Sequence, residues 1–176
     1  ANWRGASSDV AFRKFLLGDY DPKTLDPNRS FIEASPCEEA ASLMRWVKEL
    51  DRPFLMHIDL HETTDSDEEE FRPALAARDG KSFTPGQIPD GFYTVADASN
   101  PQPGFQAAII AAVEEVTHIA PPDDNGQIIG ADVTQHGVIH YAFGGLGLCA
   151  GMTQAPFTST TEVYPDSDKA TAAICN

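Results

Sequence analysis

The sequence is short of basic residues and has no long apolar run. It contains 12 lysine and arginine residues against 27 aspartate and glutamate residues, a formal net charge of -15. Because a phosphate backbone repels this charge and the basic residues are scattered, nucleic acid is excluded as an expected partner. No apolar run approaches the roughly 20 residues that cross a bilayer. The N-terminal segment also lacks the basic-then-apolar pattern of a signal peptide, so no membrane partner is expected.

Cysteine is scarce as well. The three cysteines, Cys37, Cys149 and Cys175, lie far apart and form no C-x-x-C pair. This spacing excludes a cysteine-rich zinc site and a disulfide-dense secreted scaffold. A single disulfide and the cellular location both stay open.

The pattern of apolar residues indicates an α/β layered domain. A chain of 176 residues is long enough for one domain with a hydrophobic core. Apolar residues at helical spacing predict a helix from about Pro36 to Leu50, with Ser35 as its cap and Glu38 completing a capping box. The segment PFLMHIDLHE that follows is apolar for most of its length, which predicts a buried strand.

The second half of the chain continues this alternation. We expect a helix over residues 104–117, short strands around 127–133 and 138–143, a strand over 157–164 and a last helix over 166–175. Helices and apolar strands alternate, which favours an α/β fold. The acidic run DSDEEE is expected to be a solvated loop, and the stretch GGLGLCAG a flexible loop.

Polar side chains gather on one face of the strand around His57. Alternation places Leu55, His57, Asp59 and His61 on the same face. His61 then lies at the carboxyl end of the strand, where open α/β sheets place their sites. A lone histidine in such a strand is more often a hydrogen-bonded core or edge residue, so its neighbours decide the interpretation.

Two other groups carry chemistry. The adjacent residues Asn28 and Arg29 present amide donors beside a guanidinium fork that matches a carboxylate, although such a pair beside a proline is usually a surface turn. Glu162 lies in the strand-like run TSTTEVY, where a buried carboxylate needs a partner or a function and a solvated one needs neither. Beside a metal-bound water, a buried glutamate can serve as general base.

The order of these motifs resembles the zinc carboxypeptidase family. From about Asp26 to Pro165 the chain has D-x-N-R-x-F, a capped helix, a strand ending D-L-H and a T-x-E strand. The same order is similar to the related deacylases of the aspartoacylase and succinylglutamate desuccinylase type. The resemblance implies one zinc-carboxypeptidase-like domain with a mixed, mostly parallel sheet flanked by helices.

The resemblance also implies roles for particular residues. His61 corresponds to the third zinc ligand and Glu162 to the general base. Asn28 and Arg29 correspond to the pair that binds the substrate carboxylate, and Tyr141 to a mobile tyrosine over the substrate. Zinc is the implied cofactor, and the implied substrate is a peptide or acylated amino acid with a free carboxylate.

One part of the family pattern is absent. The first two zinc ligands come from an H-x-x-E motif before the Asn-Arg pair, but no histidine precedes Asn28, and none of the five histidines has a glutamate three positions later. We therefore expect residues 1–176 to be a partial domain that lacks an N-terminal segment and is inactive by itself. Arg4 and Arg13 are both candidates for the arginine that stabilises the oxyanion.

The expected function is a zinc metallocarboxypeptidase-like hydrolase that cleaves an amide bond next to a free carboxylate. The motif D-L-H-E-T-T also fits an N-acyl amino acid deacylase, but the long segment before Glu162 and the presence of Tyr141 favour the carboxypeptidase. A catalytically inactive carboxylate-binding domain is a further alternative. The last alternative is a self-contained metal site formed by His57, Asp59, His61 and Glu62, with the acidic run DSDEEE supplying further ligands. Alternation, however, places Glu62 on the other face of the strand.

Overall fold

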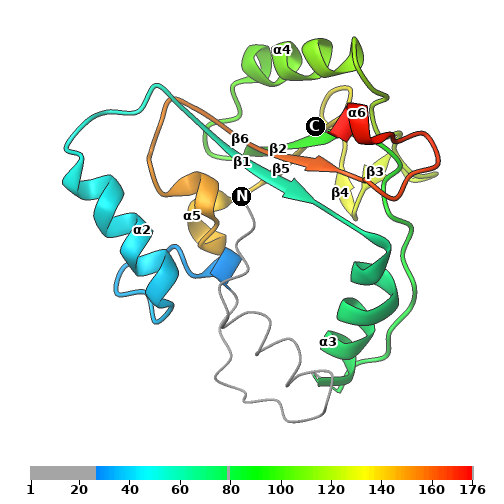
Figure 1. Cartoon of the computed structure of the whole chain (residues 1–176), viewed down its shortest axis with the longest axis horizontal. Coiled ribbons are helices and arrows are strands. Elements are labelled where there is room, and N and C mark those ends of the chain that lie inside the picture. The colour runs from blue at the N-terminus through cyan, green and yellow to red at the C-terminus, as the bar shows by residue number, and fades with distance from the viewer. Residues whose placement is uncertain (1–26, 79, 176) are drawn as a thin grey trace.

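The computed structural model describes residues 27–78 and 80–175, and a mixed four-stranded sheet lies at its centre (Figure 1). The outer pairs of strands are parallel, and the central pair is antiparallel. This arrangement confirms the prediction of an α/β fold with a mixed sheet flanked by helices. In spatial order the strands are β1 (Met56–Glu62), β6 (Phe157–Val163), β2 (Tyr93–Asp97) and β5 (Val138–Tyr141).

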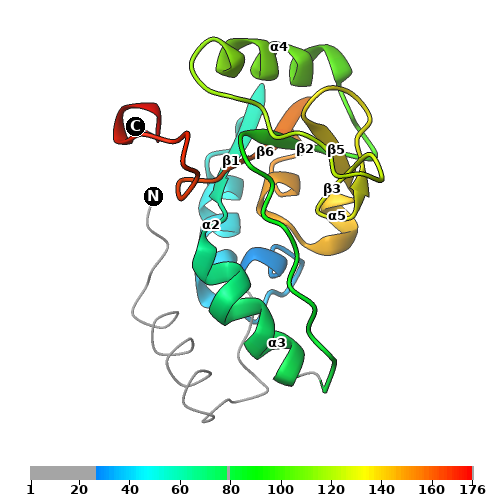
Figure 2. The same ribbon diagram turned by 90° about the vertical axis from the view of Figure 1, so that its right-hand side faces the viewer.

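Helix α4 (Pro103–Glu114) covers one face of the sheet (Figures 1 and 2). Ile110 on this helix packs with Phe92, which precedes β2, with Ala96 of β2 and with Val138 of β5. The buried side chain of Gln106 donates a hydrogen bond to the Thr158 carbonyl and accepts one from the Ser159 hydroxyl. These polar bonds tie α4 to β6, so the helix has a defined position on the sheet.

The residues under α4 form one hydrophobic core. A second hydrophobic core lies on the opposite face of the sheet, where two short helical turns pack. These turns are α5 (Phe143–Leu146) and η3 (Cys149–Gly151), in the glycine-rich stretch that was predicted to be a flexible loop. That prediction was wrong, because the stretch forms helical turns and its Ala150 is fully buried. The members of this core are Tyr93, Val95, Ala120, Ile128, Ile139, Phe143, Leu148 and Ala150.

Strand β1 was predicted to be buried, and this prediction was wrong within the part of the chain that the structure describes. The strand lies at the edge of the sheet, with β6 as its neighbour. Met56 and Leu60 are 50% and 76% exposed. They lie on the face that carries α4, but α4 packs mainly on β2. The apolar run therefore predicted the strand correctly but not its degree of burial.

Helix α2 (Glu38–Glu49) confirms the predicted helix with a later start. Its N-cap residue is Cys37, which makes no side-chain capping bond. The Ser35 hydroxyl instead accepts a hydrogen bond from the Cys37 backbone N–H at 3.2 Å. The predicted capping box was wrong because Pro36 lies outside the helix, which moves Ser35 away from the first helical turn.

The remaining elements differ in part from the expected ones. Most of the acidic run that was predicted to be a loop lies in a helical segment, η2, which continues into α3. Strand β2 was not predicted. The last helix is shorter than expected. The bounds are η1 (Pro27–Arg29), η2 (Asp67–Phe71), α3 (Arg72–Arg78), β3 (Gln127–Ile128), β4 (Ala131–Asp132) and α6 (Ala172–Cys175).

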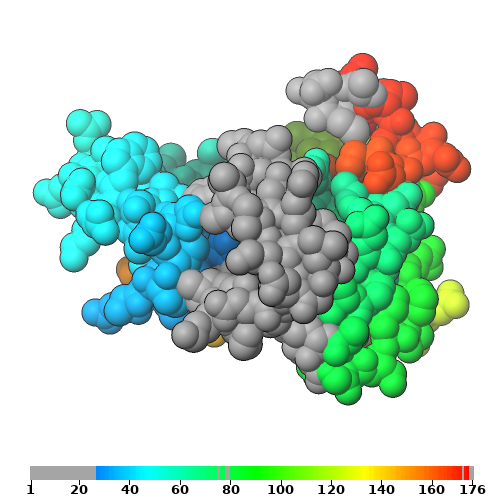
Figure 3. Space-filling model, turned by 60° about the horizontal axis from the view of Figure 1, so that its bottom comes forward, coloured from blue at the N-terminus to red at the C-terminus, as the bar shows by residue number. Residues whose placement is uncertain are grey.

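Helices α2 and α3 lie at opposite ends of the molecular surface in the view of Figure 3. Residues of α2 occupy one end, and residues of α3 with the loop after it occupy the other. None of the helices in the described ranges is both long and apolar enough to span a bilayer.

Candidate functional site

His61 and Glu162 meet at the carboxyl ends of two parallel strands. They are register partners on β1 and β6, and His61 Nδ1 lies 3.5 Å from Glu162 Oε1. On its other side, His61 Nε2 lies 3.1 Å from Asp59 Oδ2. Hydrogen bonds to Asp59 and Glu162 raise the pKa of His61 to about 10, so the imidazole is held as a cation between two carboxylates.

A third polar side chain holds the far oxygen of Glu162. The Thr63 hydroxyl donates to Glu162 Oε2 at 3.5 Å. The backbone N–H of Thr63 also donates to the Val163 carbonyl at 2.9 Å, which continues the ladder past both site residues. Both carboxylate oxygens therefore face donors from β1 and the residue that follows it.

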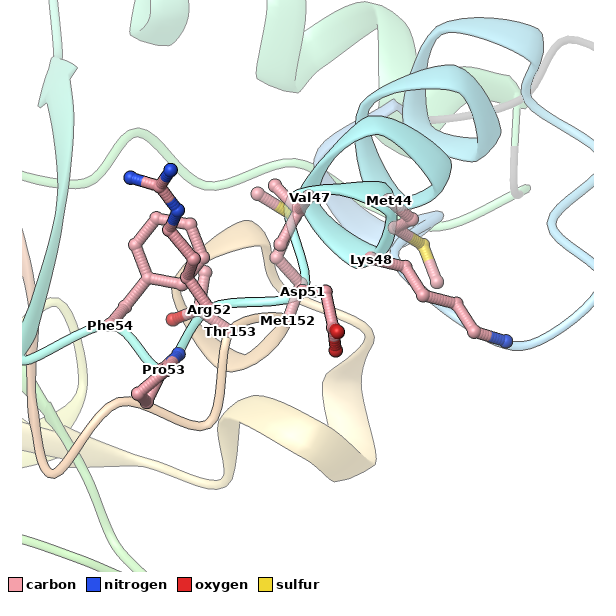
Figure 4. Close-up of a pocket in the computed structure, with 9 residues that line it drawn as sticks. All are labelled: Met44, Val47, Lys48, Asp51, Arg52, Pro53, Phe54, Met152 and Thr153. Atoms are coloured by element: carbon pink, nitrogen blue, oxygen red, sulfur yellow. The ribbon is translucent and has the colours of Figure 1, made fainter.

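His57 lies on the same face as His61 but points toward another element. His57 Nδ1 lies 3.1 Å from the Thr153 hydroxyl, beyond η3. Burial lowers the pKa of His57, against the opposing effect of Asp59. Thr153 also lines a cavity of about 450 Å³ between α2 and the segment before β1, whose wall includes Met44 and Phe54 (Figure 4). This cavity lies on the His57 side of the polar face.

Tyr93 lies directly across from Glu162 on the other neighbouring strand. The sequence reasoning missed this residue because strand β2 was not predicted. Burial raises the pKa of Tyr93, and the charge of Glu162 acts in the same direction. The aromatic, β-branched sequence FYTV was the signal that could have revealed the strand.

Tyr141 lies on β5, and the charge of Arg29 acts on it. Burial raises the pKa of Tyr141, while the positive charge of Arg29 lowers it and the negative charge of Glu162 raises it. The predicted residues Arg29, Tyr141 and Glu162 therefore share one electrostatic environment. Asn28 precedes Arg29 in the 3-10 turn η1 and is partly buried.

The backbone next to Arg29 is anchored on the loop after α5. The Phe31 N–H donates to the Gly147 carbonyl at 3.0 Å. Gly147 has φ +66°, and a Cβ there would lie 2.8 Å from the Arg29 carbonyl oxygen. Only glycine adopts this conformation at such a close approach without strain, so Gly147 allows the backbone of Arg29 to pack against it.

Arg72 is a second cation near the two tyrosines, and the sequence reasoning missed it too. Its charge lowers the pKa of both Tyr93 and Tyr141. Arg72 also forms an ion pair with Glu68, one helical turn earlier. It lines a cavity of about 380 Å³ together with Ile128, which belongs to the same core as Tyr93. It follows the acidic run that was predicted to be a loop, and no helix was predicted there.

The described residues hold no complete metal site. Within residues 27–78 and 80–175, no three His, Cys, Asp or Glu side chains form a group that could hold a metal ion. His61 is a suitable imidazole ligand, but each of its nitrogens faces a carboxylate. The described residues therefore do not fit a complete zinc centre, which needs at least three protein ligands.

His57 and His61 face different partners, and the described residues hold no metal group that joins them. Arg4 and Arg13 lie outside the described residues. Cys37 and Cys149 are free thiols.

In comparisons with known proteins, the chain matches no protein-family model and no curated protein sequence.

Proposed function

We propose that the chain contributes to a zinc-dependent metallocarboxypeptidase-like hydrolase that cleaves an amide bond next to a free substrate carboxylate. The observation that carries this proposal is the pairing of His61 with Glu162 at the carboxyl ends of parallel strands. This edge of an open α/β sheet is where such folds bind ligands. A carboxylate held there beside an imidazole can accept a proton from water.

Each residue of the candidate site has a proposed role. Glu162 is the general base, and Thr63 and His61 orient its two oxygens. Arg29, with Asn28, binds the substrate carboxylate, and its charge acts on Tyr141. Holding the carboxylate fixes the scissile bond near Glu162, which supplies proximity as well as specificity.

His61 is one ligand of the proposed metal. Zinc, when bound, would acidify a water molecule and polarise the scissile carbonyl. The other ligands are not among the described residues.

The test is hydrolysis by the full-length gene product of three matched substrates. These are a blocked dipeptide with a free terminal carboxylate, its terminal amide, and an N-acyl amino acid. We expect cleavage of the first, with at least about a tenfold preference over the amide, since one charge-assisted hydrogen bond contributes about 1.5 to 3 kcal/mol. Faster cleavage of the acyl amino acid would assign the chain to the deacylases.

Arg29→Gln isolates the carboxylate contact. It should raise KM for the free-carboxylate substrate and leave cleavage of the amide unchanged. Arg45→Gln, on the exposed side of α2, is the matched control. Carboxylate binding that is sensitive to Arg29 but without cleavage of any substrate would reject the hydrolase and favour an inactive carboxylate-binding domain.

A further inference from the structure

Tyr93 combines deep burial with a position over the site. The residue is 3% exposed and packs in the core with Val95, Ile128 and Ile139. Its backbone is the register partner of Glu162 on antiparallel strands, so the two side chains stand side by side on the same face. The aromatic ring thus packs in the core, and the Tyr93 hydroxyl lies on the same face of the sheet as Glu162.

The Tyr93 hydroxyl has no hydrogen-bond partner among the described residues, yet it is not one of their fully enclosed polar atoms without a partner, so it keeps access to solvent. The charges of Glu162 and Tyr141 raise its pKa and the charge of Arg72 lowers it, beside the larger effect of burial. Most buried tyrosine hydroxyls have a hydrogen-bond partner. A phenylalanine would fill the same core, so packing alone does not require the hydroxyl. The hydroxyl is therefore not explained by packing.

The groups around this hydroxyl define what it could bind. Glu162 is an acceptor of a proton in the proposed reaction, and Arg72 and Arg29 are cations near Tyr93 and Tyr141 respectively. A neutral phenol among these groups donates one hydrogen bond. Its natural complement is an oxygen atom of a ligand that lies over Glu162, either a carbonyl or a carboxylate oxygen.

We propose that Tyr93 is a further substrate-binding residue, whose hydroxyl donates a hydrogen bond to an oxygen of the substrate beside Glu162. This inference rests on the proposed hydrolase function. Tyr93 contributes to the site from β2, so β1, β6 and β2 each place one side chain there: His61, Glu162 and Tyr93. The site then spans three adjacent strands of the sheet.

Tyr93→Phe tests the proposal in the full-length protein, because it removes the hydroxyl alone. We expect kcat/KM to fall about tenfold to a hundredfold, which is the range for the loss of one hydrogen bond to a charged oxygen or to an oxygen that becomes charged in the reaction. The melting temperature should stay the same or rise, since the native contacts of the hydroxyl are not lost. A parallel loss of stability and activity would make Tyr93 a purely structural residue and overturn the proposal, as would an unchanged kcat/KM.

Tyr164→Phe is the matched control. The Tyr164 hydroxyl donates to Asp65 Oδ1 at 2.6 Å, so its removal should lower the melting temperature and leave kcat/KM unchanged. If the protein hydrolyses nothing, calorimetric binding of an N-acyl amino acid takes the place of kcat/KM. Weaker binding by Tyr93→Phe would then support Tyr93 while the hydrolase fails, and equal binding would reject both.

Discussion

His61 and Glu162 face each other across two parallel strands, with His61 Nδ1 3.5 Å from Glu162 Oε1. The two residues come from distant parts of the sequence, and the strand register brings them together. Their pairing places an imidazole and a carboxylate at the edge of the sheet where the proposed chemistry occurs.

If Glu162 is the general base, Glu162→Gln removes the proton acceptor and keeps the shape of the side chain. We expect kcat to fall about a hundredfold to ten thousandfold, while KM changes little. Glu115→Gln, at the exposed end of α4, is the control and should behave as the wild type. Retention of most activity by Glu162→Gln would remove Glu162 from this role.

Gly147 should be required for the position of Arg29. Gly147→Ala places a Cβ 2.8 Å from the Arg29 carbonyl oxygen and adds strain at φ +66°. We expect η1 to shift and KM for a carboxylate substrate to rise about tenfold, which corresponds to about 1.4 kcal/mol. Gly144→Ala is matched to it, because nothing lies within 4 Å of a Cβ at that position. Equal KM values for the two variants would contradict this account.

Asp90 joins the segment after β6 to the start of β2. Asp90 Oδ2 accepts a hydrogen bond from Lys169 at 2.6 Å, and Asp90 Oδ1 accepts one from Ser167 at 2.5 Å. The Lys169 bond is the largest cause of a pKa for Asp90 that is well below its ordinary value of 3.8. Since folding lowers this pKa, the ionised carboxylate stabilises the fold at pH values above that ordinary value. The contribution is lost as the pH falls toward the folded-state pKa.

Asp90→Asn should therefore lower the melting temperature at pH 7, and the difference from wild type should shrink as the pH falls below about 4. Because the group is partly screened by solvent, we expect a difference of no more than about 1 kcal/mol. Thermal unfolding followed from pH 7 down to about pH 2 measures it. Asp168→Asn, at an exposed neighbouring position, is the control. A difference that does not depend on pH would show that the ionisation of Asp90 does not stabilise the fold.

Thr94 carries a hydroxyl that the core does not use. The residue is fully buried in β2, and its Oγ1 has no hydrogen-bond partner among the described residues. Thr94→Val keeps the shape and removes the unsatisfied group, so the free energy of unfolding should rise by about 1 kcal/mol. Urea denaturation measures this change, and a decrease would mean that the hydroxyl has a partner in solution.

Much of the site could be predicted from the sequence, because alternation along one strand fixes a shared face. His57, Asp59 and His61 share that face in the structure, as period-two spacing requires. The pairing of His61 with Glu162 depends on the register of distant strands, which local pattern does not contain. It was reached only through the resemblance in motif order.

Other parts were missed for identifiable reasons. Strand β2 is short and buried at four of its five positions, so it shows no alternation between exposed and buried residues, and Tyr93 was missed with it. Arg72 follows an acidic run that has the composition of a loop but forms a helix. The exposure of Leu60 depends on which elements cover β1, and this is a property of the whole fold rather than of the segment.

The most direct test of the central claim is the zinc content of the full-length gene product, measured by elemental analysis after purification without chelators. The proposal predicts about one zinc ion per chain in the wild type and in His136→Ala, and its loss in His61→Ala. His136 is a suitable control because it is 62% exposed and pairs with Glu114 at the end of α4. A wild-type protein that binds no zinc, or zinc that stays bound in His61→Ala, would contradict the account.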